Sequence, residues 1–124
     1  MADKKKILIV DDDPNVHIIL KLTLEKAGYQ TASAMDAMQG PMMARTYKPD
    51  LIILDIMMPA GGGTMVYRRL KQNTLTMNIP VIVHSSTLQD AIRDSMPEID
   101  DIPMIQKPAD LTQLLTLIAQ FVPA

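Results

Sequence analysis

The sequence contains no cysteine and no tryptophan, and aromatic residues make up only 3% of it. Without cysteine the chain has neither a disulfide framework nor thiol chemistry, which suits a reducing cytoplasm. Eleven methionines are present, and their soft, flexible side chains are expected to fill much of the core. With 124 residues and an apolar content of 48%, the chain fits one packed domain rather than a disordered segment.

A long apolar run and an excess of positive charge are also absent. The basic run Lys4–Lys6 precedes only four apolar residues, 7–10, which is shorter than a signal peptide or a membrane helix requires. The net charge is −2, whereas a general nucleic-acid binder is usually strongly basic. We therefore expect a cytoplasmic protein that neither inserts into membranes nor binds nucleic acid.

Short apolar runs alternate with helical patterns along the chain. Three runs are near-continuously apolar, as in parallel strands covered on both faces; a fourth is interrupted by Pro103, and a weaker one alternates like an edge strand. In the same order, these runs are residues 7–10, 51–54, 81–83, 102–105 and 29–34. A strand followed by a helix, five times over, predicts an α/β domain with a doubly wound parallel sheet and helices on both faces.

Three predicted helices carry signals for their ends. Asp13 is a suitable N-cap for a helix that takes Pro14 at its first position and exits through Gly28. Two later segments resemble capping boxes, in which side chains three residues apart satisfy backbone N–H groups. These segments are Thr87-x-x-Asp90 and Asp110-x-x-Gln113.

Two other helices are less regular. A helix over residues 64–73 follows three glycines, 61–63, which we expect to form a flexible loop; no Lys-Ser/Thr follows them, so they are not a P-loop. The stretch 36–47 contains Gly40-Pro41. Proline inside a helix removes a hydrogen bond and clashes with the preceding turn, so we expect a kink or a helix that begins near Pro41.

Polar residues follow the carboxyl ends of the predicted strands, where such folds bind ligands. Carboxylates, a hydroxyl and an ammonium would meet there, and each has a use in phosphoryl transfer. Magnesium prefers oxygen ligands, an aspartate can attack phosphorus, and a lysine or hydroxyl stabilises the charge of the transferred group. The residues are Asp11–Asp13, Asp55, Ser85 and Lys107.

Each of these residues has an ordinary structural explanation when it is taken alone. The run of three aspartates equally suits a helix cap with a solvated neighbour and a metal site. Asp55 could be a structural acid, Ser85 a turn hydroxyl and Lys107 a surface charge. Their occurrence together, in this order along the chain, favours a phosphoryl-transfer site. His84 is expected to point to the other side of its strand and to be a packed residue rather than a ligand.

The motifs resemble the receiver domain of bacterial two-component response regulators. The resemblance rests on "DDD", "LDIMMP", the serine of "VIVHSS" and "KP", and it covers essentially the whole chain. The spacings are 43 residues from Asp12 to Asp55, 30 from Asp55 to Ser85 and 22 from Ser85 to Lys107. The family's fold is a three-layer, flavodoxin-like arrangement of five parallel strands in the order 2-1-3-4-5.

The resemblance implies a role for each site residue. Asp55 would be phosphorylated, Ser85 and Lys107 would each contact a phosphoryl oxygen, and Lys107–Pro108 would be a cis peptide. Mg²⁺ would be bound by Asp11 (through water), Asp12, Asp55 and the backbone carbonyl of Met57. The family's usual aromatic residue three positions before the lysine is replaced by Met104.

The resemblance also implies partners. A histidine kinase or a histidine phosphotransfer protein would donate the phosphoryl group, and a downstream protein would respond to altered contacts. The protein would not be an enzyme beyond its own phosphorylation and dephosphorylation. A homodimer through the fourth helix, the fifth strand and the last helix is a further expectation.

The last helix has an apolar arc of roughly 200°, wider than the roughly 100° that covers a core. Leu117 and Phe121 lie at the edge of this arc, so we expect them to be exposed and to form part of a protein contact. The alternatives are that the loop 97–103 covers them or that the C-terminal end frays.

Residues 1–124 are expected to form one receiver domain without an output domain, since 17 residues follow Lys107. A receiver within a longer protein is the alternative. Two other functions compete: a binding module that works without phosphorylation, and an aspartate-based magnesium phosphohydrolase. The second has a D-x-D-x-T/V motif, in which Asn15 would replace the Thr or Val.

Overall fold

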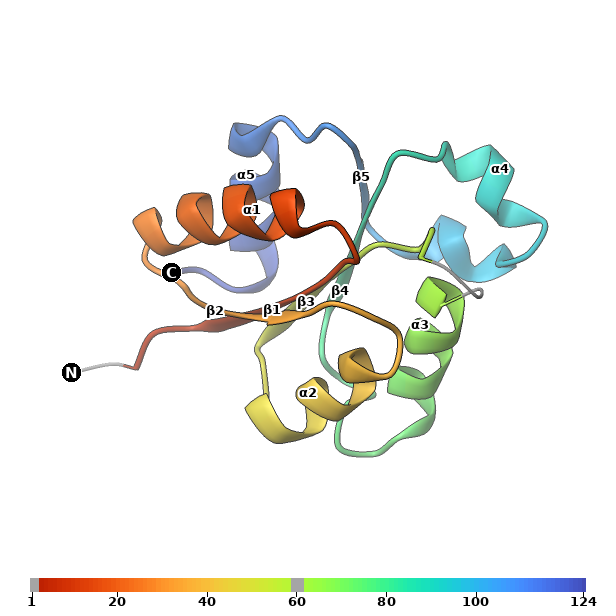
Figure 1. The fold of residues 1–124 in the computed structure, drawn as a ribbon, viewed down its shortest axis with the longest axis horizontal. Coiled ribbons are helices and arrows are strands. Elements are labelled where there is room, and N and C mark those ends of the chain that lie inside the picture. Colours follow the sequence, from red (N-terminus) through yellow and green to blue (C-terminus); the bar gives the residue numbers. More distant parts are fainter. Residues whose placement is uncertain (1–2, 59–61) are drawn as a thin grey trace.

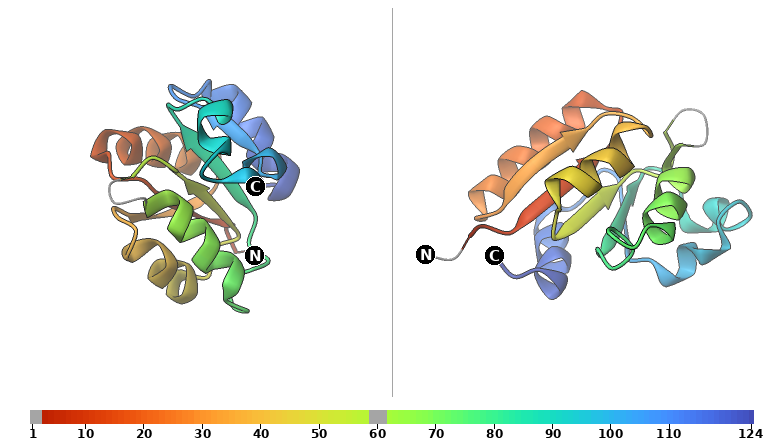
Figure 2. Two further views of the ribbon diagram at one scale, coloured as in Figure 1. Left: turned by 90° about the vertical axis from the view of Figure 1, so that its right-hand side faces the viewer. Right: turned by 90° about the horizontal axis from the view of Figure 1, so that it is seen from below.

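The computed structural model describes residues 3–58 and 62–124. Five parallel strands form one sheet in the order β2-β1-β3-β4-β5. Helices α1 and α5 cover one face, and α2 and α3 cover the other (Figure 1 and Figure 2). The three-layer, flavodoxin-like fold expected from the sequence is therefore confirmed. The strands are β1 Lys6–Val10, β2 Gln30–Ala34, β3 Leu51–Leu54, β4 Val81–Ser85 and β5 Met104–Gln106; the helices are α1 Pro14–Lys26, α2 Gln39–Tyr47, α3 Gly62–Gln72, α4 Gln89–Arg93, the 3₁₀ helix η2 Pro97–Asp101 and α5 Leu111–Phe121.

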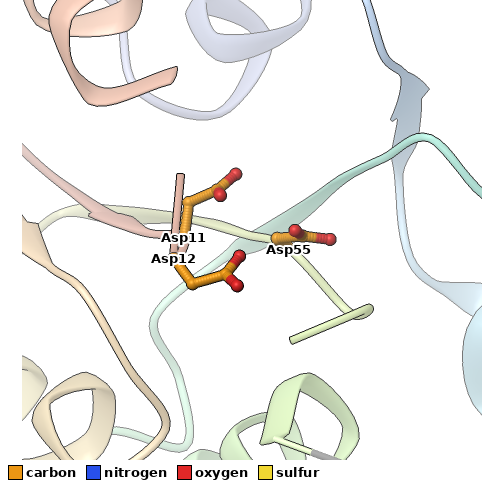
Figure 3. A group of neighbouring side chains, drawn as sticks. All are labelled: Asp11, Asp12 and Asp55. Atoms are coloured by element: carbon orange, nitrogen blue, oxygen red, sulfur yellow. The ribbon is translucent and has the colours of Figure 1, made fainter. Parts of the chain in front are cut away.

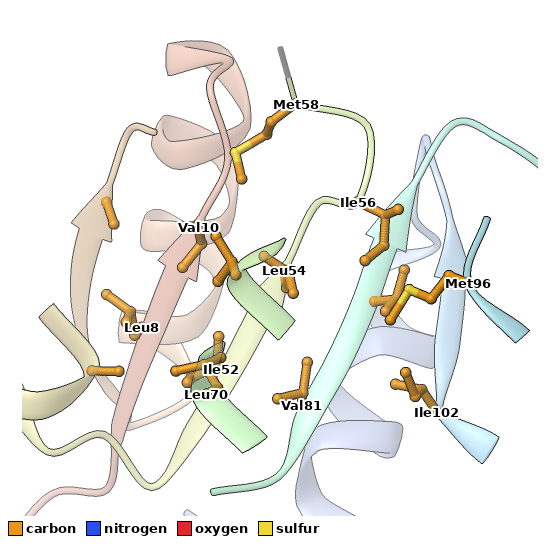
Figure 4. Packing of buried hydrophobic residues seen from close by; sticks show 14 of the residues in the cluster. Leu8, Val10, Ile52, Leu54, Ile56, Met58, Leu70, Val81, Met96 and Ile102 are labelled. Carbon is orange, nitrogen blue, oxygen red and sulfur yellow. The ribbon is translucent and has the colours of Figure 1, made fainter. Parts of the chain in front are cut away.

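The central strands are apolar throughout because both of their faces are buried. In β1, Ile7 and Ile9 pack toward α1 and α5, whereas Leu8 and Val10 pack toward the opposite face. Figure 4 shows this second cluster, in which Leu70 of α3 lies with side chains of β1 and β3. Burying one such aliphatic side chain contributes about 1.5–3 kcal/mol, so the two clusters hold the sheet between its helices.

The predicted ends of α1 and the predicted start of α2 are confirmed. The Asp13 side chain accepts a hydrogen bond from Asn15 N–H at 2.9 Å. After α1 the chain turns at Gly28, whose φ is +101°. Helix α2 begins at Gln39, close to Pro41. The N–H of Gln39 donates to Asp36 Oδ1 at 2.8 Å. Pro41 therefore lies in the first turn, where a backbone N–H has no intrahelical partner to lose.

The prediction that the glycine run 61–63 forms a flexible loop is wrong for Gly62 and Gly63, while Gly61 lies outside the described residues. Gly62 and Gly63 are the first residues of α3, and both are buried. A Cβ at Gly63 would overlap Ile56 Cα and the carbonyl oxygen of Asp55. These glycines thus allow the start of α3 to approach the backbone that follows β3.

The capping box predicted at Thr87 is also wrong. Helix α4 has Leu88 as its N-cap, without a side-chain hydrogen bond, and Thr87 N–H instead donates to Ser85 Oγ at 3.2 Å. Only Ile92 of the expected apolar stripe is buried, because α4 is five residues long. By contrast, Asp110 caps α5 as predicted, since its side chain accepts from Gln113 N–H at 3.1 Å.

Strand β5 begins two residues later than the predicted run 102–105. Ile102 is the C-cap residue that follows the 3₁₀ helix η2, and Pro103 has no N–H to donate to a neighbouring strand. Its carbonyl still accepts from Val83 N–H at 2.8 Å, so pairing with β4 starts here. Among the helices of residues 3–58 and 62–124, none has the length and apolarity needed to span a bilayer.

Candidate functional site

Two strands place the acidic residues at one edge of the sheet. Val10 of β1 lies beside Leu54 of β3, so Asp11 and Asp55 leave the sheet as neighbours. Asp55 N–H donates to Val10 O at 2.9 Å, which holds the end of β3 against β1. Figure 3 shows Asp11, Asp12 and Asp55 together, and each offers a carboxylate oxygen within 4.8 Å of the other two. The predicted convergence of these aspartates is confirmed.

The ammonium group of Lys107, in the loop that joins β5 to α5, contacts this acidic cluster. Lys107 Nζ donates to Asp11 Oδ2 at 2.7 Å and to Asp55 Oδ2 at 3.2 Å. Partial burial lowers the pKa of Lys107, but the two carboxylates outweigh it and hold this pKa above its ordinary value. The lysine therefore stays charged at neutral pH, and its peptide bond to Pro108 is cis, as predicted.

Backbone groups hold the two inner carboxylates in place. Asp13 N–H donates to Asp11 Oδ1 at 2.9 Å, and Met57 N–H donates to Asp55 Oδ1 at 3.0 Å. Asp11 is 1% exposed and Asp55 is 6% exposed, whereas Asp12 is open to solvent. Each inner carboxylate is thus oriented by one backbone N–H and by the lysine, so little side-chain freedom remains to be lost on binding a ligand.

The charge balance of the cluster suits a divalent cation. Three carboxylates and one ammonium leave an excess of negative charge, which a cation would neutralise. Hard cations such as Mg²⁺ take oxygen ligands and keep several waters, and solvent reaches this edge at Asp12. The residues present therefore fit Mg²⁺, with Asp11, Asp12 and Asp55 as candidate ligands.

Met57 is linked to the acidic cluster through Asp55, and Ser85 is linked to it through Lys107. Ser85 is buried at the end of β4, and its carbonyl accepts from Lys107 N–H at 2.8 Å, which ties the serine to the lysine. Its hydroxyl accepts from Thr87 N–H. The contact of this hydroxyl with a phosphoryl oxygen and the metal ligation by the Met57 carbonyl both stay predictions.

Two histidines bear on the site, and the sequence analysis missed one of them. His17 of α1 is buried, and its Nε2 lies 2.7 Å from the carbonyl oxygen of Asp11, to which it donates. Its spacing to Leu20 and Leu24, which places all three on the inner face of α1, was the available signal. His84 is buried as expected, and its pKa is lowered to about 4 by burial and by the nearby Lys107 ammonium.

Comparison with known proteins identifies the class. The response regulator receiver domain family matches residues 7–119, so the chain belongs to this family. A DNA-binding dual master transcriptional regulator, RpaA of Synechocystis sp., is 36% identical over 115 residues, which are 91% of this chain and 47% of the regulator. Sporulation initiation phosphotransferase F of Bacillus subtilis is 31% identical over 120 residues, 96% of this chain and 94% of the relative.

Solved structures show the same fold. The receiver domain of a sensor histidine kinase from Pseudomonas aeruginosa superimposes with a TM-score of 0.87 at 19% identity, covering 98% of this chain and all of that domain.

The chain spans less than half the length of several curated relatives that it matches. It is a receiver domain of phosphorylation-based signalling; such domains are signalling modules rather than conventional enzymes. This result does not favour the phosphorylation-independent module or the phosphohydrolase.

Proposed function

We propose that Asp55 accepts a phosphoryl group, with Mg²⁺ bound by Asp11, Asp12, Asp55 and the backbone carbonyl of Met57. The observation that carries this proposal is the convergence of three carboxylates and the Lys107 ammonium at the carboxyl ends of the strands. A nucleophilic carboxylate, a cation site and a fixed positive charge are the groups that phosphoryl transfer requires.

In this proposal an Asp55 carboxylate oxygen forms a bond to phosphorus while the P–N bond of a phosphohistidine breaks. The departing imidazole takes up a proton, and Asp55 becomes an acyl phosphate. The Lys107 ammonium and the Ser85 hydroxyl each stabilise one phosphoryl oxygen. Bound Mg²⁺ would neutralise charge on the transferred group. Met57 N–H, which donates to Asp55 Oδ1, orients the acceptor carboxylate before the reaction.

The donor would be a histidine kinase or a histidine phosphotransfer protein, and the output a change in contacts with a downstream protein. The matched sporulation relative, itself named a phosphotransferase, supports a place in a relay. We assign residues 1–124 to one receiver domain that acts in the cytoplasm, where phosphohistidine donors are made from ATP. The surface of α4, β5 and α5 is the proposed output face, including a homodimer contact.

Labelling by a small acyl-phosphate donor with Mg²⁺ tests the proposal. The wild-type protein should form a stoichiometric, slowly decaying adduct, and Asp55→Asn should form none. Asp13→Asn is the matched control, because asparagine keeps the helix cap and removes a neighbouring charge. Labelling of Asp55→Asn at the wild-type rate would overturn the assignment. Continuous turnover of the donor would point to the hydrolase, and no labelling of any variant to the phosphorylation-independent module.

A further inference from the structure

The peptide unit that joins Asp11 to Asp12 is held by a side chain from outside the acidic cluster. His17 lies in the first turn of α1, and its Nε2 is 2.7 Å from the carbonyl oxygen of Asp11. A carbonyl oxygen can only accept a hydrogen bond, so Nε2 carries the proton and donates it. His17 is 6% exposed. The hydrogen bond is therefore shielded from water, which strengthens it.

The other ring nitrogen of His17 makes no contact that would explain a histidine at this position. Nδ1 is buried, and among the described residues it has no hydrogen-bond partner. An apolar side chain would fill the inner face of α1 beside Leu20 and Leu24 without leaving a polar atom unpaired there, which costs free energy. The hydrogen bond to Asp11 is thus the interaction that an apolar residue could not supply.

The hydrogen bond from His17 also bears on the position of Asp12. The Asp11 carboxylate has its own partners, the N–H of Asp13 at 2.9 Å and the ammonium of Lys107 at 2.7 Å. Asp12 is open to solvent, so the backbone that carries it sets where its carboxylate lies. The carbonyl of Asp11 and the N–H of Asp12 belong to one planar peptide unit. By holding that carbonyl, His17 sets the direction in which the chain passes from Asp11 to Asp12.

We propose that His17 is a positioning residue, which fixes the peptide unit between Asp11 and Asp12 so that both carboxylates face the cation site. This inference rests on the Mg²⁺ site of the proposed function and adds a residue to it. His17 would contact neither the metal nor the phosphoryl group, and it would act through the backbone of Asp11. Loss of a group that orients metal ligands typically costs about 10–100-fold in metal affinity.

Three variants separate the hydrogen bond from the packing of the side chain. His17→Leu keeps a buried side chain in the helix and removes the donor. His17→Gln keeps a donor, because the amide nitrogen of glutamine is as many bonds from Cα as Nε2 of histidine. Leu24→Val is the matched control, since Leu24 lies on the same buried face of α1 and packs in the apolar cluster rather than against the acidic residues.

Mg²⁺ is titrated into each ¹⁵N-labelled, unphosphorylated protein, and the amide resonances of residues 11–13 are followed by NMR. His17→Leu should raise the Mg²⁺ dissociation constant at least roughly tenfold, whereas His17→Gln should stay within about threefold of the wild type. Leu24→Val should lower the urea midpoint and leave the dissociation constant unchanged. Without metal, His17→Leu should lower the backbone order parameter of Asp12, because the peptide unit before it is no longer held.

An unchanged Mg²⁺ dissociation constant in His17→Leu would overturn the inference. So would an equal loss of affinity in His17→Gln or in Leu24→Val, because packing rather than the hydrogen bond would then be responsible. A further check needs no variant: a wild-type NMR spectrum that places the ring proton of His17 on Nδ1 alone would also overturn it. If the wild-type protein binds no Mg²⁺ while the order parameter of Asp12 still falls in His17→Leu, the metal site of the proposed function alone is contradicted.

Discussion

In and beside the acidic cluster, the charge contacts and the pKa of single residues depend on neighbours that lie far away in the sequence. Lys107 is 96 residues from Asp11 and 52 residues from Asp55, yet its ammonium contacts both carboxylates. Those contacts raise the pKa of Lys107 and leave Asp12 as the solvent-facing acid of the cluster. Asp12 is therefore the carboxylate that an incoming cation meets without first displacing the lysine.

Magnesium affinity should depend strongly on Asp12 and little on Asp13. We expect Asp12→Ala to weaken Mg²⁺ binding at least roughly tenfold, because a hard cation needs anionic oxygen ligands. Asp13→Ala should keep the metal and lose about 1 kcal/mol of stability with its helix cap. Magnesium titrations and urea unfolding measure the two effects. Retention of the metal by Asp12→Ala with its loss from Asp13→Ala would refute this assignment.

The burial of His84 should make stability depend on pH. The folded protein protonates His84 only near pH 4, because burial and Lys107 lower its pKa from 6.5. The unfolded chain protonates it below about 6.5, so the stabilisation is complete above pH 6.5 and declines as the pH falls toward 4. His84→Leu should reduce the loss of unfolding free energy between pH 7 and pH 4.5 by roughly 2 kcal/mol. Urea unfolding of both proteins at the two pH values checks this, and identical pH slopes would contradict it.

At the scale of elements, close approach of backbones decides where α3 begins. The helix starts at Gly62 and Gly63, two residues with poor helix propensity, although the sequence pattern predicted its start at residue 64. Tertiary contact overrides propensity here, since a side chain at position 63 would overlap the carbonyl oxygen of Asp55. The start of α3 is thereby packed against the segment that carries the proposed acceptor.

Gly63→Ala should destabilise the protein by about 1–3 kcal/mol, because its Cβ would displace backbone at Asp55 and Ile56. The control is Gly40→Ala in α2, where the new Cβ would lie 3.2 Å from methyl groups of Val10 and Val66, which can shift slightly. There the gain in helix propensity offsets the crowding, and the change should be close to neutral. Thermal unfolding of both variants measures the difference, and equal effects would show that the approach at Gly63 is not tight.

At the scale of the whole molecule, the packing of α5 leaves Leu117 partly buried and Phe121 exposed. The expectation that Leu117 is exposed is wrong, because it is half-buried against the cluster on the α1/α5 face. Phe121 is 44% exposed, as expected, and borders a cleft with Ile102 and Pro103 from the loop 97–103. That loop borders Phe121 without burying it, so Phe121 is the one of the two expected residues that contributes to the proposed contact surface.

Phe121→Gln should weaken self-association of the protein carrying a phosphoryl mimic at Asp55 by roughly tenfold or more, since aromatic anchors dominate interfaces. Gln120→Ala, a change at the neighbouring exposed position, should have no effect. Sedimentation velocity with and without the mimic compares the variants. Leu117→Ser should lower stability instead, by about 1–3 kcal/mol. Unchanged association of Phe121→Gln in both states, with the fold intact, would remove this face from the proposed homodimer.

Most of the fold and the acidic cluster could be predicted because their signals are local. Apolar runs mark the strands, Asp13 and Asp110 cap the helices that follow them, and the polar residues sit at strand ends. The errors at Thr87, Gly63 and Leu117 share one cause. Each depends on what another element places beside it, and neither periodicity nor capping preference contains that information.

Short segments of the chain were enough to predict the order of strands and helices and the residues at the carboxyl ends of the strands, because hydrophobic periodicity and strand ends are local properties. The three-dimensional packing was needed to show that Lys107 pairs with Asp11 and Asp55, and that His84 lines a cleft between α1 and α5. These contacts arise from strand register and helix packing, which join residues from distant parts of the chain and depend on how all the elements fit together.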